Sequence, residues 1–194
     1  MQIDNAALDQ LFRAARTYSK FLPRAVEPGI LQALYALLRW GPTSANCQPG
    51  RFVFLASPES RERLLGAMSK GNLQQTRNAP VTVIVAEDLH FYESLNRSFP
   101  HVNARAWFEG QPAVAEDTAR RNSSLPGAYL MLAARALGLD CGPMSGFDAN
   151  QVNAEFFADG RWRVNFIVNL GYGDPAWLHA RLPRLTFDET CSVL

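Results

Sequence analysis

Three polar turns interrupt otherwise apolar stretches of this chain, and their side chains are almost all neutral hydrogen-bonding groups. They are PTSANCQP (42–49), GNLQQT (71–76) and GPMSGF (142–147). Amides, hydroxyls and backbone N–H groups suit a large flat heterocycle with carbonyls and ring nitrogens, because each buried polar atom of such a ligand needs a partner. PTSANCQP alone is equally well explained as a helix stop, and GPMSGF alone is more typical of a turn. Their combination favours a ligand site.

Arginines occur in two further segments, ARTYSKF (15–21) and ARLPRL (180–185). Two or three guanidinium groups suit a single phosphate, since each can bind it through two parallel hydrogen bonds. Taken singly, Arg16, Arg181 and Arg184 are typical solvated surface charges. Together with the three polar turns, they predict a site for flavin mononucleotide (FMN).

Other kinds of chemistry find little support. GYG (171–173) lacks the third glycine and the following helix of a dinucleotide-binding turn, and no GxxxxGK[ST] motif occurs. In GPMSG (142–146) the serine lies beside the second glycine, so the segment is not a nucleophile elbow. The three histidines are isolated from one another, and no metal site is predicted.

Bulk composition sets the class of protein. The 194 residues, with 47% apolar and 19% charged, predict a single domain over 1–194 with a sizeable core. A net charge of +1 argues against nucleic acid or an anionic membrane as partner, and no apolar run reaches the roughly 20 residues of a membrane span. The N-terminus does not resemble a secretory signal, and three scattered cysteines without a CxxC pair favour a reducing cytoplasm.

The polar segments must be positioned by helices and strands. Helical spacing predicts helices over about 8–16, 29–39, 57–69, 114–137 and 148–157, with Pro126 kinking or ending the fourth. Apolar runs predict buried strands at 51–56, 81–86 and 163–172. Residues 88–112 are expected to form a short helix and a mobile loop, and GLDCGPMSGFD a glycine-rich turn. Strands separated by helices indicate a layered α/β or α+β sandwich.

Several longer motifs recur in a known pattern: GPTSANC (41–47), FPHVNARAWF (99–108), RNSSLPGAYL (121–130), GPMSGFD (142–148), NLGYGD (169–174) and ARLPRL. On these residues the sequence resembles the FMN-dependent nitroreductase family over nearly its whole length. Within that family it is similar to a subfamily containing the malonic semialdehyde reductase of bacterial uracil degradation and reductases that act with halophenol-degrading enzymes. The resemblance implies an α+β three-layer sandwich, with a central mixed sheet flanked by helices and a C-terminal extension toward a dimer partner.

The resemblance also implies a homodimer with two FMN molecules at the subunit interface. It places Asn72 and Gln75 at the polar edge of the flavin ring, and the backbone of Ser145 and Gly146 near N5 and O4. The implied phosphate and ribityl contacts are Arg16, Thr17, Ser19, Arg181 and Arg184, and the implied contacts with the partner's flavin are Pro42, Thr43, Ser44 and Asn46. Three positions depart from the family pattern: Ala15 and Ser19 replace basic residues, and Gly50 replaces a tryptophan.

The implied activity is that of an NAD(P)H oxidoreductase, with NADH or NADPH as donor and no catalytic side chain. The expected acceptor is malonic semialdehyde, reduced to 3-hydroxypropanoate. His101 and Arg105 in the FPHVNARAWF segment are expected to hold its carboxylate, with Phe108 beside the stacked ligand. The alternatives are a nitroaromatic, quinone or flavin reductase on the same scaffold, and a non-enzymatic flavin storage or sensing protein.

Overall fold

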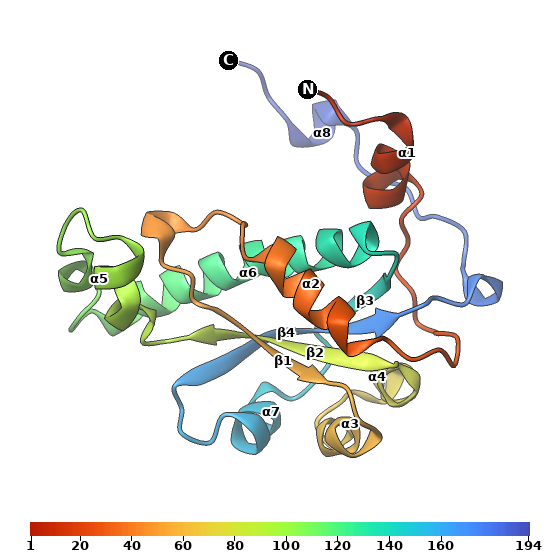
Figure 1. Cartoon of the computed structure of the whole chain (residues 1–194), viewed down its shortest axis with the longest axis horizontal. Helices are drawn as coiled ribbons and strands as arrows, with labels where there is room; N and C mark the ends of the chain where they lie inside the picture. Colours follow the sequence, from red (N-terminus) through yellow and green to blue (C-terminus); the bar gives the residue numbers. More distant parts are fainter.

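Four strands form one sheet in the order β1-β2-β4-β3, with helices on both faces (Figure 1). The computed structural model describes all residues from Met1 to Leu194. The strands are β1 (Gly50–Leu55), β2 (Val81–Asp88), β3 (Asp140–Met144) and β4 (Trp162–Gly171). The helices are α1 (Asn5–Leu8), α2 (Pro28–Leu38), α3 (Pro58–Leu65), α4 (Lys70–Asn78), α5 (Leu95–Ser98), α6 (Pro112–Ala136), α7 (Ala149–Phe156) and α8 (Phe187–Thr190).

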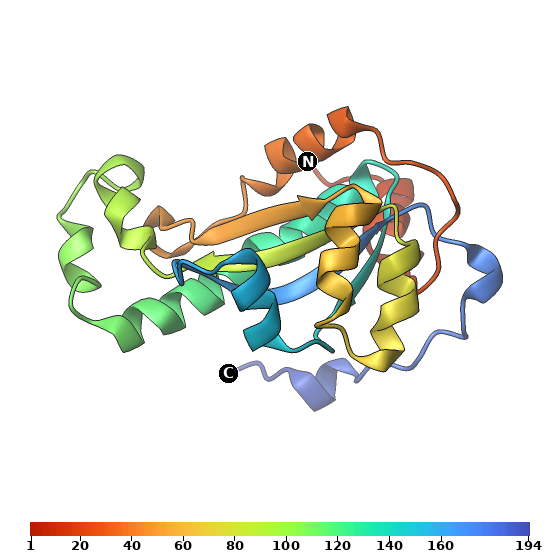
Figure 2. The same ribbon diagram turned by 90° about the horizontal axis from the view of Figure 1, so that it is seen from below.

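Strand β2 lies in the middle of the sheet and is buried along its whole length. Its side chains alternate between the faces, as strand geometry requires. Val81, Val83 and Val85 pack in one apolar core with α2 and α6, whereas Ile84 and Ala86 pack in a second core with α3 and α7. Figure 2 shows α3, α4 and α7 side by side across that second face. The predicted three-layer α+β sandwich is therefore confirmed.

The sheet is antiparallel throughout its strand pairs, so the prediction of a mixed sheet is wrong. The connection between β1 and β2 contains two helices, α3 and α4, rather than one. Each of the two helices reverses the direction of the chain, so β2 begins beside the end of β1 and runs antiparallel to it. The only parallel contact is an isolated bridge between Thr17 and Cys141.

Two elements were missed in the sequence. The segment expected to be a glycine-rich turn contains strand β3, and the GNLQQT segment lies inside helix α4. Pro126 neither ends nor divides α6, which continues unbroken through it. Tertiary packing outweighs the lost backbone hydrogen bond here, because Pro126 and Gly127 are both buried against the sheet. A Cβ at Gly127 would lie 2.4 Å from Cζ of Phe166.

Residues 89–111 leave the sheet after β2 and form a separate lobe, called the lid below, at one end of the molecule (Figure 1). The lid has its own small core around Phe91, Leu95 and Phe108. At the C-terminus, every residue from 179 to 194 is exposed, and both views show this tail running outside the layered body (Figures 1 and 2). No helix is both long and apolar enough to cross a membrane.

Candidate functional site

Helix α4 and the loop after β3 meet in a small polar cluster. Asn72 donates through Nδ2 to the carbonyl oxygen of Gly146 at 2.9 Å, and the N–H of Ser69 donates to the same oxygen at 3.0 Å. Gln75 donates through Nε2 to Oδ1 of Asn72 at 2.5 Å. Two predicted segments far apart in the sequence are thus held together by direct hydrogen bonds.

Glycine at position 146 lets the Asn72 amide come this close. A Cβ there would lie 2.5 Å from Nδ2 of Asn72, closer than real Cβ contacts allow. The N–H groups of Ser145 and Gly146 form no hydrogen bond with another protein group. Ser145 is exposed and Gly146 is half-buried, so these two donors are available to a ligand.

At the other end of β3, residues 16–19 run alongside the strand. The N–H of Tyr18 donates to the carbonyl oxygen of Cys141 at 2.9 Å. Glycines make this approach possible, since a Cβ at Gly142 would lie 2.4 Å from the Tyr18 carbonyl oxygen and one at Gly173 would lie 2.2 Å from the Tyr18 ring. Thr17 and Ser19 stay exposed beside the strand.

Two titratable groups near this segment, Tyr18 and Asp140, have raised pKa values. Burial raises the pKa of Tyr18, the Asp140 carboxylate raises it further, and Arg16 lowers it. The Tyr18 phenol therefore stays protonated at neutral pH. Burial likewise raises the pKa of Asp140, although the N–H of Gly173, which donates to that carboxylate at 2.8 Å, lowers it.

Two predicted arginines brace the N-terminal segment against the tail. Arg16 donates through Nη2 to the carbonyl oxygen of His179 at 2.5 Å. Arg181 donates through Nη2 to the carbonyl oxygens of Arg13 and Ala15 at 2.8 and 2.9 Å. Both guanidinium groups keep donors that these bonds do not use, because arginine has five N–H groups. They add two positive charges beside residues 16–19.

Arg184 lies outside this brace. Its Nη1 donates to the carbonyl oxygens of Leu182 and Pro183 at 3.0 and 3.2 Å, within its own stretch of tail. In this chain, the structure brings together two of the three predicted phosphate-binding arginines.

The turn before β1 is rigid and strained. Ala45, Asn46 and Gln48 have positive φ angles of 48°, 47° and 43°, which cost non-glycine residues roughly 1 kcal/mol or more each. Hydrogen bonds hold the turn: Ser44 N–H donates to Oδ1 of Asn122 at 2.8 Å, and Asn46 donates through Nδ2 to the carbonyl oxygen of Ser98 at 2.8 Å. Pro42, Ser44 and Asn46 are exposed, and Thr43 is half-buried.

This turn does not meet the α4 cluster in the same chain. It precedes β1, whereas α4 follows both β1 and α3, and no hydrogen bond joins the turn to α4 or to residues 145–146. The turn contacts the lid instead, because Cys47 is buried in the lid core and Asn46 bonds to Ser98. The predicted residues therefore fall into two separate groups within one chain.

In the lid, the predicted substrate residues occupy different environments. Phe108 is buried, with its ring 4.9 Å from that of Phe91, so it presents no open face to a ligand. The neighbouring Trp107 is 52% exposed. Arg105 forms an ion pair with Glu109 at 2.5 Å, and this contact raises its pKa. His101 is exposed, with its ring 5.6 Å from that of Phe99.

Sequence reasoning missed three residues of these sites. Ser69 supplies a second donor to Gly146, Asn122 fixes the strained turn, and Trp107 is the exposed aromatic residue of the lid. Asn122 could have been found, because a polar residue that faces the core of an apolar helix needs a partner. The exposure of Trp107 in place of Phe108 depends on how the lid folds.

Comparison with known proteins shows the family of the chain. Residues 12–172 match the model of the nitroreductase family. The chain belongs to this family. It is 55% identical over 192 residues to the "Putative NADH dehydrogenase/NAD(P)H nitroreductase RSc1004" of Ralstonia nicotianae, covering 99% of this chain and 98% of that relative.

Solved nitroreductases share the fold. A Bacillus subtilis structure described as a "putative nitroreductase" superposes with a TM-score of 0.89 at 22% identity, covering 98% of this chain and all of that one. A second, from Exiguobacterium sibiricum and described as a "putative nitroreductase in complex with FMN", gives a TM-score of 0.87 at 18% identity, covering 100% and 99%.

Proposed function

We propose that this nitroreductase is an FMN-dependent NAD(P)H oxidoreductase that works as a homodimer. One observation carries the proposal: strand β3 has a polar cluster with free N–H donors at one end and a pair of arginines at the other. From Cys141 to Ser145 the strand spans roughly 13 Å. This spacing suits an extended ligand with a flat polar ring at one end and a phosphate at the other.

The residues present fit FMN. Gly146 lets the Asn72 amide approach its backbone closely, and the N–H groups of Ser145 and Gly146 would meet the ring near N5 and O4. Asn72 and Gln75 would meet its polar edge. The phosphate and ribityl chain would lie along Arg16, Thr17, Ser19 and Arg181, with Arg184 as a proposed further phosphate contact.

Bound FMN supplies hydride chemistry, taking two electrons from a nicotinamide and passing them to a second substrate. The chain supplies position and electrostatics. Fixed N–H donors at Ser145 and Gly146 would stabilise negative charge as it develops near them, without reorganising. Neutral partners such as Asn72 would satisfy the ring's polar atoms in either redox state.

The two separated groups of residues support a site shared between subunits. Pro42, Thr43, Ser44 and Asn46 would contact the flavin held mainly by the partner. Large apolar side chains are exposed on the same face of the molecule, on α2 and α6, and such patches mark interfaces. They are Tyr35, Leu37, Val114, Leu125 and Tyr129, each 39–50% exposed.

For the acceptor, we propose a neutral, electron-poor aromatic molecule, such as a nitroaromatic or a quinone. The ion pair between Arg105 and Glu109 neutralises the cation expected to hold a carboxylate, while the exposed ring of Trp107 offers a stacking surface. Malonic semialdehyde is the second candidate, because the exposed imidazole of His101 could still bind its carboxylate.

Stopped-flow spectroscopy of the purified holoprotein tests the function. NADH or NADPH should bleach the flavin absorbance under anaerobic conditions, and a quinone or nitroaromatic should restore it faster than malonic semialdehyde does. A flavin that neither donor reduces would favour the storage or sensing alternative. A clear preference for malonic semialdehyde would restore that acceptor.

A further inference from the structure

A buried carboxylate lies where the chain leaves the sheet for the lid. Asp88 is the last residue of β2, and its side chain is only 2% exposed. A carboxylate withdrawn from water to this extent needs cations and hydrogen-bond donors around it. Arg51 pairs with Asp88 at 2.5 Å, and Arg161 pairs with it at 3.3 Å. The N–H of His90 donates to the same carboxylate at 2.9 Å. This set of residues, called the lid joint below, therefore connects β1, β2, the segment before β4 and the start of the lid.

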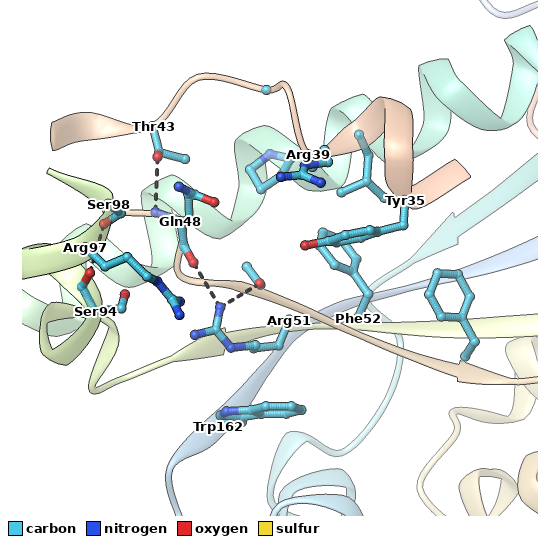
Figure 3. A pocket seen from close by; sticks show the side chains of 15 residues that line it. Tyr35, Arg39, Thr43, Gln48, Arg51, Phe52, Ser94, Arg97, Ser98 and Trp162 are labelled. Carbon is cyan, nitrogen blue, oxygen red and sulfur yellow. Dashed lines mark hydrogen bonds between the residues drawn. The ribbon is translucent and has the colours of Figure 1, made fainter. Parts of the chain in front are cut away.

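Each arginine of the lid joint also binds a second part of the chain. Nη1 of Arg51 donates to the carbonyl oxygens of Gln48 and Gly50, both at 2.9 Å, which ties the joint to the strained turn before β1. Figure 3, which looks into the cavity beside the joint, shows these two bonds. On the lid side, Nη2 of Arg161 pairs with Glu93 at 2.9 Å. The joint therefore reaches both the turn and the lid.

The turn and the lid also contact one another directly, so they form one structural unit. Asn46 of the turn donates through Nδ2 to the carbonyl oxygen of Ser98 in the lid at 2.8 Å, and Cys47 is buried in the lid core. The N–H of Asp88 donates to the carbonyl oxygen of Pro49, at the end of the turn, at 2.8 Å. A change at Asp88 therefore acts on the turn and the lid together.

Charges around the lid joint balance one another. The guanidinium groups of Arg51 and Arg161 meet the carboxylates of Asp88 and Glu93. Asp88 is the carboxylate that pairs with both arginines, and it is far more buried than Glu93. Water and salt screen a buried ion pair less than an exposed one, so the Asp88 pairs fix geometry more firmly than an exposed pair does. Asp88 is therefore the centre of the joint.

We propose that Asp88 is a positioning residue for the acceptor: its carboxylate fixes the turn and the lid to the sheet, and so sets where Trp107 meets the acceptor. This inference rests on the proposed function, in which the exposed Trp107 ring offers the stacking surface. Asp88 needs no contact with the acceptor, because it acts through the placement of the lid. The same joint holds Ser44 and Asn46 of the turn in their proposed place at the subunit interface.

Hydrogen exchange followed by mass spectrometry tests the joint without turnover. In the Asp88→Asn holoprotein, amides of the turn and the lid should exchange roughly 10–100-fold faster than in the wild type, because hydrogen bonds to a charged group are lost, while amides of α4 keep their rates. Arg161→Gln should act in the same direction, because this half-exposed side chain can be removed while Arg51 still pairs with Asp88. The matched control is Arg63→Gln, which breaks an exposed pair with Glu155 and should leave the turn and the lid at wild-type rates.

A double-mutant cycle with Trp107→Ala tests the positioning itself. Asp88→Asn and Trp107→Ala should each lower kcat/KM for a quinone by roughly 10-fold, but Trp107→Ala should lower it by less than about 3-fold in the Asp88→Asn background. If Asp88→Asn does not fold, the same cycle with Arg161→Gln decides. Additive losses in kcat/KM, or faster exchange spread evenly over the whole chain, would overturn the inference, because they indicate a structural role alone. If the holoprotein reduces no acceptor, the proposed function fails, and hydrogen exchange still decides whether Asp88 fixes the turn and the lid.

Discussion

Replacing Gly146 with alanine should weaken FMN binding by disturbing the α4 cluster. The new Cβ would lie 2.5 Å from Nδ2 of Asn72 and 3.3 Å from Oγ of Ser69. The Asn72 side chain must move by about 1 Å to reach ordinary contact distance, which breaks its 2.9 Å hydrogen bond to the Gly146 carbonyl oxygen. Gln75 would lose its anchor as well, because it donates to Asn72 at 2.5 Å.

The size of the effect follows from these bonds. Losing one or two neutral hydrogen bonds costs roughly 1–3 kcal/mol in total, which corresponds to about a 5- to 150-fold loss of FMN affinity if both anchors also contact the ring. If the same contacts stabilise the protein without FMN, Tm of the apoprotein should fall by roughly 2–12 °C.

Fluorescence titration of apoprotein with FMN measures the affinity, and thermal unfolding measures the stability. The control is Gly66→Ala at the end of α3, where a Cβ would meet nothing within 4 Å and φ is −59°. A double-mutant cycle with Asn72→Ala isolates the contact: the alanine at 146 should cost less once the Asn72 amide is gone. FMN affinity and Tm unchanged by Gly146→Ala alone would refute the reasoning.

Three further outcomes are expected. Arg16→Ala and Arg181→Ala should each weaken FMN binding by roughly 1.5–3 kcal/mol in titrations, the range for a hydrogen bond to a charged group, and unchanged affinity in the double variant would place the phosphate elsewhere. Asn122→Ala should lower the free energy of unfolding by roughly 1–2 kcal/mol in urea, because Ser44 N–H loses its 2.8 Å acceptor; an unchanged denaturation midpoint would mean that water replaces it. Burial raises the pKa of Cys47 to about 11 and that of Cys141 to about 12, so a thiol reagent at pH 8 should label only the exposed Cys191 in the folded protein, and a second fast-reacting thiol would contradict their burial.

The sequence predicted well those features that depend on local pattern. The Ser57–Pro58 start of α3 and the Asp148 cap of α7 are confirmed, because each cap is formed by neighbours in the sequence. Strands β1, β2 and β4 also lie where apolar runs predicted them, within one or two residues. The predicted burial of the first strand is wrong, because β1 is half-buried at every residue except Leu55.

The predictions that failed depended on distant contacts. Strand β3 contains a glycine and a proline, and it exists because β4 pairs with it and residues 17–18 pack on its outer side. Its antiparallel pairing, like that of β1 with β2, depends on the path of the connecting helices. A local pattern contains no information about that path.

For the candidate site, the sequence identified the segments but not their grouping. Asn72 and Gly146, 74 residues apart, meet in one cluster, and Arg16 and Arg181 brace one another's segments. The burial of Phe108 could not be foreseen, because it depends on how the lid closes on its own core, whereas the ion pair of Arg105 joins residues only four apart in the sequence.

Native mass spectrometry of the purified protein tests the central claim most directly, because it reports subunit number and bound flavin in one measurement. The account predicts a dimer of the 21.5 kDa chain that carries two FMN molecules and releases them when the subunits separate. A monomer that retains one FMN, or a dimer that takes up none when FMN is added, would contradict a flavin site shared between subunits.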